Sequence, residues 1–301
     1  MSQQDLNSRS DKGQAADKIE DPGFYIGWMP NAPSGLAKHL RKTIVILLPF
    51  VLLVAGMLAL IQKKFGTGNF EFGILTEVKG VYFSAPFPGI KVINGKDIFG
   101  NISYVTIPLI GYGKFGAESA LAAIEKEKKI SLNGKQVTMK GTLLYNDGKL
   151  LMQIDANDHF LSVLGSEADS SLRPIAQDLG IQTISGEIID PKCFFGVMKP
   201  GEGKPHKDCA IRCILGGIAP LLKVTDGMGN KNYYLIAGSQ GEKMNESVKD
   251  FVAEPVMINA RVVKYDDWII LYVSEKGIAR YSYIQEHFAG KYAGCGTTCR
   301  K

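Results

Sequence analysis

The sequence predicts a mainly β chain of the α+β class, in which one N-terminal transmembrane helix precedes two small, tandem β-barrel domains. Three observations predict it: one long uncharged apolar segment, many short apolar runs bounded by Gly, Asn and Asp, and an order of strands and helix that occurs twice. The 301 residues fit about two domains of ~150 residues each. The content of 45% hydrophobic and 22% charged residues excludes collagen-like and disordered chains.

The apolar segment covers residues 43–62, TIVILLPFVLLVAGMLALIQ, and contains no charged side chain. A helix of that length spans ~30 Å, the hydrocarbon thickness of a bilayer. The segment is too long and begins too far along the chain for a cleaved signal peptide, so a true membrane span is favoured over a buried soluble helix. Basic residues flank it on both sides: Lys38, Arg41, Lys42, Lys63 and Lys64.

The flanking charges predict the orientation in the inner membrane. Three basic residues precede the span and two follow it, which favours a cytoplasmic tail over residues 1–42, partly disordered at its start. All five cysteines follow the span, as expected for an oxidising or metal-handling periplasm. Aromatic residues in 23–37 predict an interfacial anchor or a docking surface for another subunit of a membrane complex. The net charge of +5 is scattered, so no nucleic acid is expected as a partner.

Two stretches of the chain repeat one order of elements. Residues 104–114 (YVTIPLIGYGK) match 233–243 (YYLIAGSQGEK), and a helix is expected after each, over 118–129 and 245–252. A hairpin follows in each copy, and Asp147-Gly148 suits the tight turn of the first. Five short strands with one helix are typical of an OB-like barrel, and a β-sandwich is the alternative. The predicted divisions are a first domain over 66–165, a linker helix over 166–180, a second domain over 181–285 and a tail over 286–301.

One segment of the second domain carries metal-binding chemistry. Residues 191–217 contain the pattern C-x12-H-x2-C-x3-C, formed by Cys193, His206, Cys209 and Cys213. A helix over 207–215 places Cys209 and Cys213 on one face at positions i and i+4. Cys193 arrives from the end of the preceding strand, and His206 from the loop that enters the helix. These four ligands predict a tetrahedral site for Zn2+, Cu(I) or an iron centre.

Two other interpretations of these cysteines stay open. Cys193 bonded to Cys209 or Cys213 as a structural disulfide would stabilise the domain by ~3 kcal/mol and leave one thiol unpaired. The C-x3-C pair is alternatively a reactive pair for thiol–disulfide exchange. Cys295 and Cys299 in the tail predict either a local disulfide or a second metal site.

The sequence contains no motif of a known catalytic centre, and an enzyme is not favoured. It has no ordered Ser/His/Asp set, P-loop or Gly-x-Gly-x-x-Gly. Glu187, Asp190 and Asp208 lie near the cysteines, where we expect a strand-edge charge and caps of turns or helices.

The stretch GEIIDPKCFFGVMKPGEGKPHKDCAIRCILGG resembles a family of bacterial membrane-anchored proteins without an assigned function. The resemblance is closest over 184–217, extends loosely over 23–285, and implies one span, a β-rich exterior and no particular activity. The architecture also resembles that of the periplasmic haem chaperones of cytochrome c maturation. Those use a His with a Tyr four residues later, whereas His287 and Tyr292 are five apart, so haem binding is not expected. The hypothesis is a metal-binding or redox accessory protein, with a disulfide-stapled binding module and a thiol oxidoreductase as alternatives.

Overall fold

The computed structural model describes residues 33–62, 68–96, 98–155, 160–167, 172 and 174–281. The chain divides into two units, Met1–Lys63 and Lys64–Lys301. The predictions for most of the cytoplasmic tail and for the C-terminal tail, including Cys295 and Cys299, fall outside the described residues.

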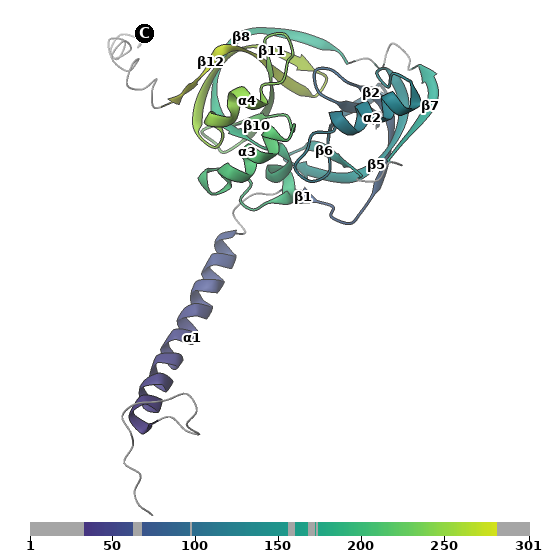
Figure 1. Ribbon diagram of the computed structural model, residues 1–301. Coiled ribbons are helices and arrows are strands. Elements are labelled where there is room, and N and C mark those ends of the chain that lie inside the picture. Colours follow the sequence, from purple (N-terminus) through teal and green to yellow (C-terminus); the bar gives the residue numbers. More distant parts are fainter. Residues whose placement is uncertain are drawn as a thin grey trace, which may run out of the picture. The chain divides into compact units, whose positions relative to one another are not determined.

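In the first unit, helix α1 runs from Ser34 to Gln62 (Figure 1). Its length and composition suit a membrane span, and the apolar side chains along it are exposed. The helix begins nine residues before the predicted residue 43, because the preceding polar segment is made largely of good helix formers such as Leu, Ala, Lys and Arg. Pro49 lies inside the helix, as membrane helices tolerate.

In the second unit, five strands close a first barrel. Antiparallel pairs join β5 to β2, β2 to β3, β3 to β4 and β6 to β5, and a parallel pair between β4 and β6 closes the ring. Helix α2 (Glu118–Lys128) connects β4 to β5, as predicted. The strands are β2 (Thr76–Phe83), β3 (Gly89–Lys96), β4 (Ile102–Ile110), β5 (Lys135–Asn146) and β6 (Lys149–Ile154).

A second barrel follows with the same order of strands. Antiparallel pairs join β11 to β8, β8 to β9, β9 to β10 and β12 to β11, and β10 and β12 close the ring in parallel. The short helix α4 (Asn245–Val248) and a 3-10 turn, η4 (Lys249–Phe251), connect β10 to β11. The strands are β8 (Ala176–Ile189), β9 (Leu221–Thr225), β10 (Lys231–Gly238), β11 (Pro255–Tyr265) and β12 (Trp268–Arg280).

This shared topology, a three-stranded meander followed by a helix and a hairpin, confirms the prediction of two tandem OB-like barrels. Equivalent glycines support the match between the copies. A Cβ at Gly80 would lie 2.3 Å from the carbonyl oxygen of Lys91, and a Cβ at Gly186 would lie 2.4 Å from that of Lys223. Both positions therefore need glycine, because the next strand of each barrel passes too close for a side chain.

The predicted linker helix over 166–180 is wrong for the described residues. Strand β7 (Leu161–Glu167) pairs with β5, and β8 already begins at Ala176. Ala176, Gln177 and Leu179 favour a helix, but β11 pairs with residues 176–182 in an antiparallel ladder from Tyr265 to Ala260. Tertiary pairing thus overrides the local helix propensity. A further short strand, β1 (Asn69–Phe70), also pairs with β5.

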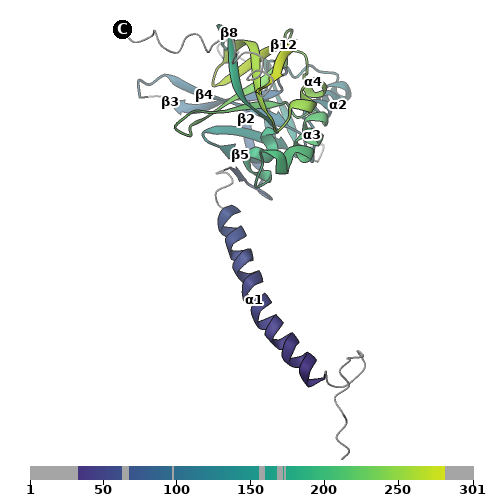
Figure 2. The same cartoon turned by 90° about the vertical axis from the view of Figure 1, so that its left-hand side faces the viewer.

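The barrels share a hydrophobic cluster as well as having cores of their own. This cluster combines residues of the first barrel, Ile110, Leu144 and Leu151, with residues of the second, including Phe194 and Trp268. Polar bonds also cross between the barrels. Tyr233 Oη donates to Asp147 Oδ2 at 2.6 Å, and Trp268 Nε1 donates to the carbonyl oxygen of Thr106 at 2.8 Å. Figures 1 and 2 show the two sets of strands side by side in one unit.

Candidate metal centre

The Cys/His segment is inserted between the first two strands of the second barrel. After β8 ends, Asp190 caps a short helical turn: its Oδ1 accepts the backbone N–H of Lys192 at 2.9 Å, and its Oδ2 accepts that of Cys193 at 3.3 Å. This confirms the expected capping role of Asp190. Cys193 therefore begins a π-helical turn, η2 (Cys193–Val197), and does not end the strand. The cap fixes the backbone of Cys193.

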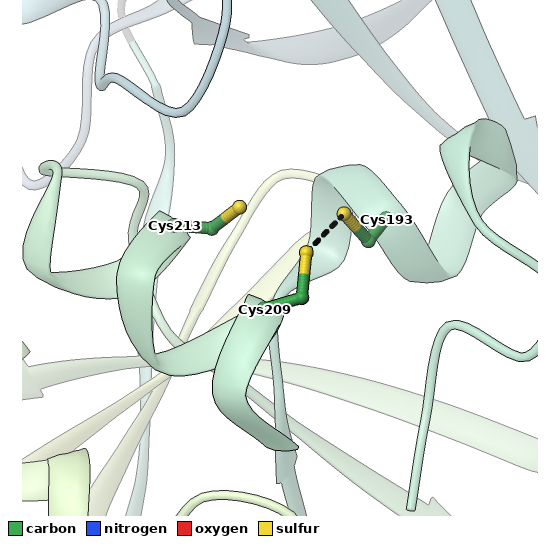
Figure 3. A group of neighbouring side chains, drawn as sticks. All are labelled: Cys193, Cys209 and Cys213. Atoms are coloured by element: carbon green, nitrogen blue, oxygen red, sulfur yellow. Dashed lines mark hydrogen bonds between the residues drawn. The ribbon is translucent and has the colours of Figure 1, made fainter. Parts of the chain in front are cut away.

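The second part of the insertion is helical, as predicted. A 3-10 turn, η3 (Lys204–His206), leads into α3 (Lys207–Leu215), with His206 at its N-cap. Cys209 and Cys213 lie on consecutive turns of α3 and project from one face (Figure 3). The helix also buries Ala210 and Ile214 in the core of the second barrel, which holds this face in place.

The three cysteine side chains converge. Their sulfur atoms all lie within 4.8 Å of one another, and Cys193 Sγ is 4.0 Å from Cys209 Sγ (Figure 3). Cys193 and Cys213 are buried, Cys209 is partly exposed, and all three are free thiols in the structure. Two sulfurs that bind one ion at ~2.3 Å in tetrahedral geometry lie roughly 3.8 Å apart. The sulfur separation therefore matches ligands of one ion more closely than a disulfide of ~2.05 Å.

His206 belongs to a second, overlapping group. One ring nitrogen of His206, a carboxylate oxygen of Asp190 and Cys193 Sγ lie within 4.8 Å of one another, and all three residues are buried. His206 Nε2 has no hydrogen-bond partner among the described residues. The structure thus brings the three predicted cysteines together and places the predicted histidine beside Cys193 alone. Asp190 is the member of this group that sequence analysis assigned only as a cap.

A lysine from the first barrel reaches the thiols. Lys114 Nζ lies 2.9 Å from Cys209 Sγ and 3.8 Å from Cys213 Sγ. The hydrogen bond to Cys209 raises the pKa of Lys114. Its loop packs against the end of α3, where a Cβ on Gly216 would lie 1.9 Å from the carbonyl oxygen of Lys114. Gly116 N–H also donates a hydrogen bond to the carbonyl oxygen of Gly216 at 3.1 Å, which stabilises the packing of this loop on α3.

A second lysine is buried beside the site. Lys192 Nζ donates to the carbonyl oxygens of Gly111, at 2.9 Å, and Gly113, at 2.5 Å. Burial lowers the pKa of Lys192, and the carboxylate of Asp190 acts in the opposite direction. Two lysines therefore offer positive charge next to three thiols and one carboxylate. No local pattern identifies Lys114 as part of the site, because loop 111–117 and the cysteines meet only in the folded unit. Lys192 is adjacent to Cys193 in the sequence, but its contacts with Gly111 and Gly113 also form only on folding.

The two buried thiols differ in acidity. The hydrogen bond that Cys193 donates to Cys213 lowers the pKa of the Cys213 thiol, and the nearby Lys114 ammonium acts in the same direction. That same hydrogen bond, together with burial, raises the pKa of Cys193. Burial lowers the pKa of His206 and favours the neutral imidazole, the form that binds metals. Three thiols, which lose their protons when they bind a metal, and a neutral imidazole are donors to which soft or borderline cations bind.

Comparisons with protein families and with curated proteins found no match. Among solved structures, a deletion mutant of the single-stranded DNA binding protein from Thermus aquaticus is similar at 11% sequence identity, with a TM-score of 0.18. The similarity covers 72% of this chain and 89% of that chain. At this TM-score it carries no weight for the function.

Proposed function

We propose that the chain is a membrane-anchored accessory protein, or a subunit of a membrane complex, that binds metal at a centre formed by Cys193, Cys209 and Cys213, with His206 beside Cys193. The observation that carries this proposal is the convergence of three free thiols within 4.8 Å at a largely buried position. Lys114 of the first barrel lies 2.9 Å from Cys209 Sγ, a contact that favours a thiolate ligand. Cysteines that only fill a hydrophobic core do not require such a contact. Zn2+, Cu(I) and iron all bind such ligands.

The location is part of the same proposal. The apolar helix α1 would anchor the chain in the inner membrane, with its N-terminus in the cytoplasm. The barrels and the metal centre would then face the periplasm, where incoming metal ions and membrane redox partners are both accessible. Other subunits of the complex would be its partners.

The test is a metal analysis of the full chain, purified in detergent under anaerobic conditions. A variant with Cys295→Ser and Cys299→Ser limits the remaining thiols to three. We expect about one or more metal ions per chain, and three thiols that react after denaturation with a chelator. Cys213→Ser should bind less metal than the parent, whereas Asp208→Asn, which alters an exposed residue of the same helix, should bind as much. A chain that holds no stoichiometric metal would contradict the proposal.

A second function is favoured by one distance. Cys193 Sγ and Cys209 Sγ are 4.0 Å apart, so a small movement would join them, and Cys209 is the partly exposed thiol. A disulfide partner protein would have to accept the two electrons and two protons that the thiols release. The thiol count separates the functions, because the Cys193–Cys209 disulfide leaves one reactive thiol in the variant without tail cysteines. If only one thiol still reacted after treatment with a mild reductant, the disulfide would be a structural one.

A further inference from the structure

The two groups at the metal centre share a single sulfur. Cys193 Sγ belongs to the trio with Cys209 and Cys213, and also to the trio with Asp190 and His206. A single tetrahedral ion would need all four of its donor atoms at roughly 3.3–3.8 Å from one another. His206 does not join the three sulfurs within even 4.8 Å. One ion therefore does not reach all four predicted ligands in this arrangement.

His206 points to an occupant of its own. The residue is 3% exposed, and its Nε2 has no hydrogen-bond partner in the described part of the chain. A buried polar atom without a hydrogen-bond partner is unfavourable. One ring nitrogen of His206 lies within 4.8 Å of Cys193 Sγ, so a cation bound between these two residues would give the buried imidazole a partner. Asp190 is less available as a ligand, because each of its carboxylate oxygens already accepts a backbone N–H.

Formal charge limits which ions the centre can hold. Three thiolates and the Asp190 carboxylate carry four negative charges when metal is bound, since bound cysteines are deprotonated. The ammonium groups of Lys114 and Lys192 supply two positive charges. Two positive charges remain to be provided, by one divalent ion or by two univalent ions. An uncompensated net charge at such a buried site would be costly.

We propose that the centre holds two Cu(I) ions bridged by the Cys193 thiolate, one among the three sulfurs and one between Cys193 and His206. This inference rests on the proposed metal-binding function. Thiolate and imidazole are suitable ligands for Cu(I), and two univalent ions neutralise the charge of the cluster. A divalent ion such as Zn2+ satisfies the same charge as a single ion. The site therefore binds either two univalent ions, such as Cu(I), or one divalent ion, such as Zn2+.

The experiment measures two stoichiometries on the full chain in detergent, with Cys295→Ser and Cys299→Ser present so that the tail binds nothing. Cu(I) is titrated anaerobically against a colorimetric Cu(I) chelator, and Zn2+ is titrated separately. We expect two Cu(I) or one Zn2+ per chain. His206→Ala should bind one Cu(I), and the matched control Asp208→Asn should still bind two. Far-ultraviolet circular dichroism checks that each variant is folded.

The other possible results contradict either the copper pair or the metal-binding function. One Cu(I) per parent chain, or two in a folded His206→Ala variant, would overturn the copper pair while leaving the metal-binding function intact. Two Zn2+ per chain would overturn the charge argument and with it the choice of ion. Binding of neither metal would instead remove the proposed function itself. The Cu(I) stoichiometry of the parent chain is measured without any substitution at the site. It therefore tests the copper pair even if His206→Ala fails to fold.

Discussion

Lys91 Nζ of the first barrel lies 2.9 Å from Asp266 Oδ1 of the second barrel. The Lys91 side chain is 1% exposed and that of Asp266 is 11% exposed, so this ion pair is removed from water. Asp266 also accepts a hydrogen bond from Thr106 Oγ1 at 3.3 Å, and it occupies the turn between β11 and β12 with φ of 52°. The turn between β11 and β12 of the second barrel therefore contacts both β3 and β4 of the first barrel.

Asp266→Asn should destabilise the two-barrel unit by ~3 kcal/mol, because it removes the carboxylate charge that lies 2.9 Å from the buried ammonium of Lys91. Asn tolerates the positive φ, so the change tests charge and not backbone strain. The measurement is urea unfolding followed by tryptophan fluorescence. The double variant with Lys91→Met should recover part of the loss, since it removes both charges. A single variant within about 0.5 kcal/mol of the parent would contradict this account.

Gly216→Ala should cost ~1–3 kcal/mol, the usual range for forcing atoms into filled space. The added methyl would meet the carbonyl oxygen of Lys114, so the loop must retreat and Lys114 must leave Cys209. Metal affinity should fall with it. The matched control is Gly227→Ala, since a Cβ there meets nothing within 4 Å. Equal unfolding midpoints and equal metal affinities for the two variants would show that the contact is unimportant.

The stability contributed by Glu254 should depend on pH. Hydrogen bonds from Lys207, at 2.5 Å, and Arg280, at 2.6 Å, lower the pKa of its carboxyl group in the folded protein. The unfolded group titrates near ~4.3, so its contribution is complete above that pH and is lost as pH falls through the lower folded value. The difference in unfolding free energy between parent and Glu254→Gln should therefore shrink below pH ~4.

Unfolding in urea at several pH values measures this difference. Glu246→Gln provides the control, because Glu246 forms its ion pair with Lys249 at the surface. That variant should stay within about 0.5 kcal/mol of the parent. A Glu254→Gln difference that is the same at pH ~3 and pH ~7 would rule out the titration of this group as the cause.

Bound metal should stabilise the fold. A ligand that binds only the folded state stabilises it by about 2.7 kcal/mol at a free concentration 100-fold above Kd. For a unit of this size, that raises the Tm by roughly 5–10 °C. Scanning calorimetry with Cu(I) or Zn2+ and then with excess chelator should show the rise and its reversal. Cys213→Ser should show a smaller rise, because it removes one of the three sulfur ligands, and a metal-induced rise of the same size in that variant would place the metal elsewhere.

Local signals in the sequence were sufficient for much of the fold. The positions of α2 and α3 follow from their runs of helix formers and, for α3, from Gly216-Gly217 after its last residue. Asp147-Gly148 forms the expected turn with φ of 47° and 75°. Repetition of the strand order predicted two barrels, because equivalent strands carry equivalent apolar patterns. Residues 176–180 were predicted as helix because the strand that determines their conformation, β11, lies far along the chain: Ala176 pairs with Tyr265 and Asp178 with Val263.

The site was predictable only in part, for a similar reason. The spacing of Cys209 and Cys213 defines a helical face, so their convergence was expected. The position of His206 beside Asp190 depends on the path of the loop between η2 and η3, which no residue pattern specifies. Lys114 is 95 residues from Cys209, and only the packing of one barrel on the other brings them together.

The turns between paired strands interlock in a reciprocal way. Asp147, in the turn after β5, bonds to Tyr233 on β10, and Asp266, in the turn after β11, bonds to Thr106 on β4. Because β4 and β10 are equivalent strands, the contact is approximately isologous, like that of a two-fold homodimer. A single barrel of this kind would leave the face exposed unless a second copy covered it. Because both barrels belong to one chain, the cover is always present, and the two halves can differ, as they do in the cysteine insertion of the second barrel.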